Sequence, residues 1–245
     1  MVRSFNQLVW ELIELYRQNY KVSDSIDERL FATWVQSTRA KLIKQRLDEH
    51  MRIPDEHWVQ DLGYVEMESV DSSVYPGITS EKYILRSKNS IPWTIHYKGS
   101  PGGFTRIGPA DKLGINYRLV TYERALVSGN GKFNSNQVYA FLDGDKICLI
   151  SKSNIHKQIK YINVKGIFEN PIDAYEFKNG ANPYSWDYEY PVSDSLVNDI
   201  KNIIVKENFN LIMVPIDDKK PDNIDNVTRP APDENSNSIN PNARR

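Results

Sequence analysis

Apolar side chains recur at helical spacing in the first fifty residues. Residues 4–20 predict an amphipathic helix that Ser4 can cap, and a second helix is predicted from about 26 to 51. The apolar face of the first helix comprises Phe5, Leu8, Val9, Leu12, Ile13, Leu15 and Tyr16. Pro54 ends this region. Because the connection between the two helices is short, we expect an antiparallel helical hairpin over 1–53.

From Gly63 onward apolar and polar residues alternate, which is typical of half-buried strands. Strands are expected at 64–70, 81–86, 93–97, 117–127, 132–142, 146–151 and 159–168, with a loop at 98–109. Asn130-Gly131 and Asp143-Gly144 are turn signals between the later strands. We therefore predict an antiparallel β-meander as the body of the protein, over 54–216.

A last helix is predicted at 194–207, with Ser193 as its N-cap and Asp194 in the first turn, where negative charge is favoured. Its apolar face comprises Leu196, Ile200, Ile203 and Ile204. We expect this helix to close the body by covering one face of the sheet. The change Ile200→Asp would then bury a charge without a partner and strongly destabilise the subunit.

The chain after Pro215 is rich in Asn, Pro, Asp and Ser. Such a composition buries too little apolar surface to offset the entropy of ordering, so we predict an irregular C-terminal arm over 217–245. In particular, 228–245 should not belong to the fold of the isolated subunit. The short apolar run at 209–214 before the arm is a further candidate strand. The expected fold class is therefore α+β, with helical hairpin, β-meander, closing helix and arm.

Composition excludes several classes of protein. A net charge of -1 over 245 residues gives no general attraction to nucleic acid or to a membrane surface. No apolar run approaches the roughly 18 residues that a membrane span needs, so no membrane partner is expected. A single cysteine, Cys148, cannot form an internal disulfide, and its apolar neighbours predict a buried thiol. We expect a chain made in the reducing cytoplasm of its host.

Motifs that would carry chemistry are missing from the sequence. The Gly-rich loop at 98–108 lacks the Gly-Lys-Ser/Thr end of a phosphate-binding loop, and no Gly-x-Ser-x-Gly elbow occurs. The four histidines do not have the spacing of metal ligands: His50, His57, His96 and His156. The aspartates of the arm lack calcium-loop spacing. We therefore expect no enzyme, no cofactor and no metal site.

One stretch of the second helix is unusually basic. It contains Arg39, Lys41, Lys44 and Arg46. This is either a solvated face or a contact with acidic protein or a phosphate backbone. Arg39 and Arg46 lie two turns apart and point the same way, so changing both to Glu should block assembly while the monomer stays folded. The arm adds three acidic candidates for partner contact, Asp217, Asp218 and Asp222.

Three stretches together resemble a structural protein of crAss-like bacteriophages, the short-tailed phages of gut Bacteroidales. They are 104–151, beginning FTRIGPADKLGINYRLVTYERALV, then INVKGIFENPIDAYEF at 162–177, and WDYEYPVSDSLVNDIKNIIVKE at 186–207. The pattern is similar to the ring protein of the head-to-tail connector, over about residues 5–227. This resemblance implies a virion component at the portal vertex of the tail, in a ring that matches a twelve-fold portal and surrounds a DNA channel. Its implied partners are copies of itself, the portal protein and other ring or tail proteins.

Two other functions compete with this interpretation. A DNA-binding or packaging accessory protein of the virion would use the basic stretch from Arg39 to Arg46. A hydrolase acting on host glycans would use the aromatic-rich sheet. Oligomer size separates a ring protein from an accessory protein, and an activity screen on polysaccharides tests the hydrolase.

Overall fold

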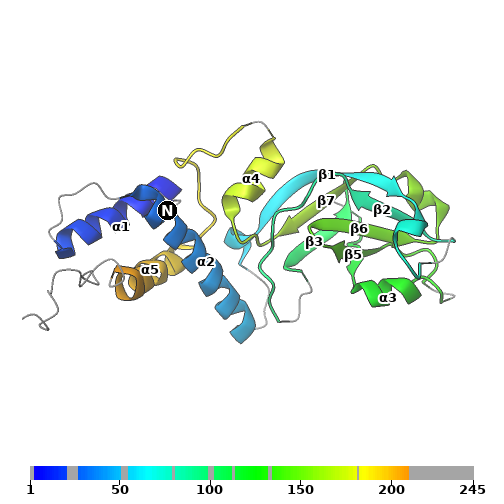
Figure 1. The fold of residues 1–245 in the computed structure, drawn as a ribbon, viewed down its shortest axis with the longest axis horizontal. Helices are drawn as coiled ribbons and strands as arrows, with labels where there is room; N and C mark the ends of the chain where they lie inside the picture. Colours follow the sequence, from blue (N-terminus) through cyan, green and yellow to red (C-terminus); the bar gives the residue numbers. More distant parts are fainter. Residues whose placement is uncertain are drawn as a thin grey trace, which may run out of the picture.

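A computed structural model describes residues 3–20, 27–50, 55–78, 81–98, 102–111, 114–131, 134–180 and 182–209. The fold is α+β, as predicted, with two N-terminal helices, a seven-stranded sheet and a C-terminal helix. Helices α1 (Phe5–Tyr20), α2 (Glu28–His50) and α5 (Asp194–Ile203) gather at one end of the molecule and the strands at the other (Figure 1). We call the first end the helical unit, which is formed by α1, α2 and α5. We call the second end the sheet unit, which is formed by the seven strands and the helix α3 (Tyr122–Val127) that packs on them. The predicted arm, 217–245, and the candidate strand beyond Phe209 lie outside the described residues.

The helical unit is built on the apolar stripes that the sequence predicted. Helix α1 is Phe5–Tyr20, α2 is Glu28–His50 and α5 is Asp194–Ile203, which continues as a π-helical turn over Ile204–Asn208. Figure 1 shows α2 returning past α1, as expected for a hairpin. The stripe of α1 is buried at Phe5, Leu8, Val9, Leu12, Ile13 and Tyr16.

Helix α5 lies beside the N-terminal helices and does not cover the sheet, which corrects the prediction of its packing (Figure 1). Leu196, Val197 and Ile200 are buried in one core with the apolar stripes of α1 and α2. Ser193 precedes α5 as predicted, but its side chain makes no capping hydrogen bond. The apolar stripe of α5 was correctly identified, yet periodicity alone does not say which apolar surface it meets.

The strands form one sheet in the order β3-β7-β1-β2-β6-β5-β4. Their bounds are β1 Gln60–Val70, β2 Tyr83–Ser87, β3 Phe104–Pro109, β4 Arg118–Leu119, β5 Tyr139–Asp143, β6 Lys146–Ser151 and β7 Tyr161–Gly166. All neighbouring pairs are antiparallel except β4 and β5. The edges approach each other, because the N–H of Tyr117, just before β4, donates to the carbonyl of Ile107 in β3 at 2.7 Å.

The predicted meander is correct only in part. The Asp143-Gly144 turn does join β5 to β6 as a hairpin. However, β7 pairs with β1 and β3, not with β6, and β3 occupies the second half of the predicted loop at 98–109. Local alternation identifies a strand without identifying its partner, so these long-range pairings were not visible in the sequence.

Residues 117–127 are a strand for only two residues and then form helix α3, Tyr122–Val127. Tyr122, Ala125 and Leu126 pack on the sheet at helical spacing. The prediction of a strand over the whole of 117–127 is therefore wrong. As a result Asn130-Gly131 follows a helix and does not join two strands. Residues 93–97, all described, contain an isolated bridge between Thr94 and Phe168 and no strand.

Both faces of the sheet are packed. One core gathers residues of β1, β3, β6 and β7, among them Leu62, Ile107 and Val164. The other face is covered by α3 and the segment around Tyr75, and it buries Cys148, as predicted. Burial raises the pKa of this thiol to about 11, and the Tyr75 hydroxyl lies 3.2 Å from its sulfur. Helix α4, Pro171–Asn179, packs on β1 near the helical unit.

Candidate subunit contact surfaces

The basic stretch of α2 begins with a side chain that faces inward. Arg39 is fully buried where the helical and sheet units meet. Its Nε donates to the carbonyl of Pro191 and its Nη1 to the carbonyl of Phe168, both at 3.0 Å. The guanidinium carbon lies 5.7 Å from the centre of the Tyr190 ring. The interpretation of Arg39 as an exposed contact residue is therefore wrong, because its donors hold two chain segments that link the units.

The electrostatics of this joint follow from its burial. Desolvation lowers the pKa of Arg39, and it raises the pKa of Tyr190 to about 12. Among the described residues, the Nη2 of Arg39 and the hydroxyl of Tyr190 have no hydrogen-bond partner. A buried cation held by carbonyl oxygens is costly to form and costly to break, so Arg39 fixes the geometry of the joint.

Two further cations of the stretch connect α2 to the C-terminal helix. Arg46 pairs with Asp199 at 2.6 Å, and Lys41 pairs with Glu207 at 3.3 Å. These pairs are partly exposed, so each contributes about 1 kcal/mol or less. The sequence could not show them, because the partners are more than 150 positions away along the chain. The three acidic candidates of the arm, Asp217, Asp218 and Asp222, all lie outside the described residues.

Helix α2 keeps one polar stripe in solvent, which we call the α2 face. Its exposed side chains recur every three or four positions: Leu30, Thr33, Ser37, Lys41 and Lys44. Lys44 has no ion-pair partner among the described residues. The α2 face therefore presents two lysines and one partly exposed leucine. It retains two of the four basic residues that the sequence singled out.

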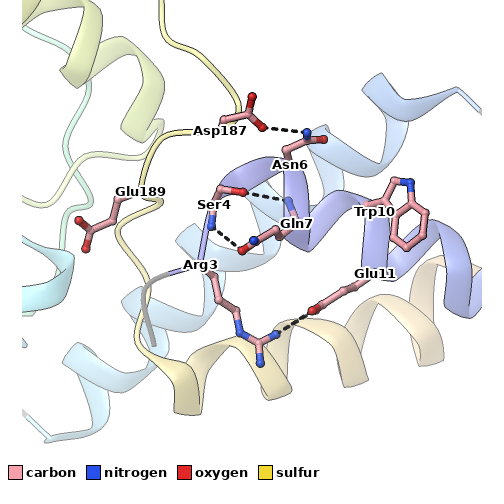
Figure 2. A pocket seen from close by; sticks show the side chains of 8 residues that line it. All are labelled: Arg3, Ser4, Asn6, Gln7, Trp10, Glu11, Asp187 and Glu189. Carbon is pink, nitrogen blue, oxygen red and sulfur yellow. Dashed lines mark hydrogen bonds and ion pairs between the residues drawn. The ribbon is translucent and has the colours of Figure 1, made fainter.

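A groove of about 690 Å³ lies on the other side of α1, and we call it the α1 groove (Figure 2). It is lined by Arg3, Ser4, Asn6, Gln7, Trp10, Glu11, Asp187 and Glu189. A capping box closes the start of α1, because the Ser4 hydroxyl accepts from the N–H of Gln7 and the Gln7 side chain accepts from the N–H of Ser4. Ser4 thus caps the helix as predicted. The amide of Asn6 also donates to Asp187 at 3.0 Å, which fixes the segment opposite α1.

The α1 groove carries an excess of negative charge. Glu11 is bound by Arg3 at 2.9 Å and by Lys201 of α5, so its charge is compensated. Asp187 and Glu189 are exposed on the rim and have no cation partner among the described residues. Trp10 lines the same groove and is 59% exposed. The groove therefore combines an exposed indole with two uncompensated carboxylates.

Sequence reasoning missed this groove, although one signal was present. Trp10 falls outside the apolar stripe of α1, so a large aromatic side chain stands on the polar side of the helix. Tryptophan at such a position is typical of contact surfaces. Asp187 and Glu189 alternate with aromatic residues along the sequence, a pattern that does not show that they lie across from α1.

Other kinds of site find little support in the described parts of the chain. No group of three or more His, Cys, Asp or Glu residues there could hold a metal ion. Burial lowers the pKa of His156, whose Nδ1 lies 2.8 Å from the Ser151 hydroxyl, a contact that fixes the turn after β6. None of the described helices combines the length and the apolar character that crossing a bilayer requires.

Comparison with known proteins places this architecture in a family. A family described as phage tail ring protein 2 matches residues 7–227, which include both units. Ring protein 2 of Bacteroides phage crAss001 is 28% identical over 178 residues, or 69% of this chain and 74% of that protein. The resemblance to a ring protein of crAss-like phages is thereby confirmed. The chain belongs to the crAss-like phage tail ring protein 2 family, whose members are structural components of the phage tail.

Proposed function

We propose that copies of this chain form a closed ring in the head-to-tail connector, next to the portal, and that DNA passes through its centre. The family match carries this proposal, because it extends through both units and not through one of them alone. A twelve-fold ring would match the symmetry of a portal, and the portal and other ring or tail proteins are its proposed neighbours.

The construction of the subunit supports a mechanical role. The two units lie end to end (Figure 1), and buried contacts of Arg39 hold the segments between them. Such a subunit can transmit force between neighbours without changing shape. A net charge of -1 also suits a DNA passage, because a strongly basic wall would bind the phosphate backbone and slow its movement.

The alternative of a DNA-binding accessory protein loses much of its basis. Its evidence was the basic stretch of α2, but Arg39 is buried and both Lys41 and Arg46 have carboxylate partners in the same chain. We assign the C-terminal arm to contacts with neighbouring proteins, and its candidates there are Asp217, Asp218 and Asp222. The family match continues to 227, so the first part of the arm belongs to the shared pattern.

Electron microscopy of the purified chain, alone and mixed with the portal protein, tests the proposal. We expect class averages of discrete rings with an open centre and twelve-fold symmetry. A small species in both samples that binds DNA with strongly salt-dependent affinity would contradict the proposal and favour the accessory protein.

A further inference from the structure

A closed ring requires each copy to present two different faces that fit each other, because a surface that pairs with itself yields only a dimer. The α1 groove and the α2 face meet the first condition. Helices α1 and α2 pack through their apolar stripes, so their polar sides point away from each other. Figure 2 shows α2 behind α1 when the groove is viewed from the front.

The two surfaces carry opposite charge. Asp187 and Glu189 give the α1 groove its uncompensated negative charge. On the α2 face Lys44 has no ion-pair partner among the described residues, so its positive charge is uncompensated. Lys41 lies one turn before it and pairs with the exposed Glu207 of the same chain, a weak surface pair that a neighbouring carboxylate can replace. Opposite charges on facing surfaces direct association and exclude the wrong orientation.

Each surface also offers an apolar group near its charges. Trp10 is 59% exposed in the α1 groove, and Leu30 is 39% exposed on the α2 face. A tryptophan that becomes buried between partners is a common centre of binding energy. Charge and apolar surface are thus combined on both sides.

We propose that the α1 groove of one copy receives the α2 face of a second copy, and that repetition of this contact closes the ring. The inference rests on the proposed function, and it names the surfaces that join the copies. In this contact Asp187 and Glu189 face Lys41 and Lys44 of the neighbour, and the neighbour also covers Trp10. The helical unit then provides the contact between copies.

Charge reversal on each surface separately tests this contact in the full-length chain. A groove variant carries Asp187→Lys and Glu189→Lys, and a face variant carries Lys41→Glu and Lys44→Glu. Each variant should place like charges opposite each other and raise the concentration needed for assembly by more than about tenfold. Sedimentation velocity and negative-stain microscopy measure assembly, and circular dichroism confirms that each variant is folded.

Mixing the two variants, or combining their changes in one chain, gives the most discriminating result. In a one-to-one mixture the basic groove of one variant meets the acidic face of the other, and the two unaltered surfaces also fit. We therefore expect rings of alternating copies from the mixture, and rings from a chain that carries all four changes. Rescue in these two samples cannot arise from misfolded variants.

A matched control uses Lys157→Glu and Lys160→Glu, which also lie three positions apart and are exposed, but on the sheet unit. This variant should assemble like the unaltered chain. Rings from the groove variant and from the face variant, each alone at ordinary concentration, would overturn the contact. A mixture of the two that stays unassembled would overturn it as well. Absence of rings from the unaltered chain, with and without portal protein, would overturn the proposed function itself.

Discussion

The helical unit and the sheet unit are held together by different means. In the helical unit, side chains from distant parts of the sequence fill one core, and ion pairs such as that between Glu11 and Lys201 join its surface. In the sheet unit, backbone ladders set the arrangement, and side chains fill the space on both faces. The stability of the helical unit should therefore depend mainly on the identity of its buried side chains. The stability of the sheet unit should depend mainly on whether a substituted residue can adopt the backbone conformation that its position requires.

Where the two units meet, side-chain contacts and backbone hydrogen bonds both hold the structure. Arg39 is a side chain of the helical unit, and its partners are backbone carbonyls of the chain segments that connect to the sheet. The Ile95 N–H donates to the carbonyl of Ile167, and the Ile167 N–H donates to the carbonyl of Gly103. Changes at this joint should affect both units together.

The largest effect is expected from Ile200→Asp in the helical unit. Ile200 is completely buried among the three helices, so the new carboxylate would lose its hydration without gaining a partner. We expect a loss of about 3–5 kcal/mol in the free energy of unfolding, measured by urea denaturation. Ile115→Asp is the control, because Ile115 is 90% exposed and its replacement should change stability little. An unchanged melting temperature for Ile200→Asp would show that this stripe is not part of the core.

Arg39→Met should rank second and act on the joint. The change keeps an apolar stem but leaves the carbonyls of Phe168 and Pro191 without their donors. We expect a loss of about 2–5 kcal/mol. Arg46→Met is the matched control on the same helix, because it removes a partly exposed pair and should cost about 1 kcal/mol or less. This replaces the expectation that Arg39→Glu would leave the monomer folded. Equal stability of the two Met variants would contradict the inward role of Arg39.

A smaller effect should separate two glycines of the sheet unit. Gly103 and Gly144 both have positive φ, so alanine at either position is strained by about 1–2 kcal/mol. At Gly103 the added methyl group would also overlap the carbonyl oxygen of Ile95, whereas at Gly144 nothing lies within 4 Å. Gly103→Ala should therefore be less stable than Gly144→Ala by about 1–3 kcal/mol. Thermal unfolding of the two variants measures this difference. Equal melting temperatures would show that the backbone around Ile95 can move enough to accommodate a methyl group at Gly103.

Prediction from the sequence succeeded where the signal was local. The stripe of α1, its capping by Ser4 and the β5–β6 turn were all visible in short windows. Prediction failed where a partner was needed. The basic residues of α2 read as one exposed group, but Arg39 is buried and Arg46 pairs with α5, because these partners approach only when the chain is folded.

The sequence by itself determined the class of fold, the apolar stripes of the helices and most of the strands, because side-chain periodicity follows directly from backbone geometry. It also determined the family, through a pattern that extends over 7–227. Only the tertiary structure decided that α5 joins the N-terminal helices, that β7 lies between β1 and β3, and that the α1 groove exists. Each of these depends on contacts between segments far apart in the chain, and their energies are set by shape and burial that no local pattern encodes.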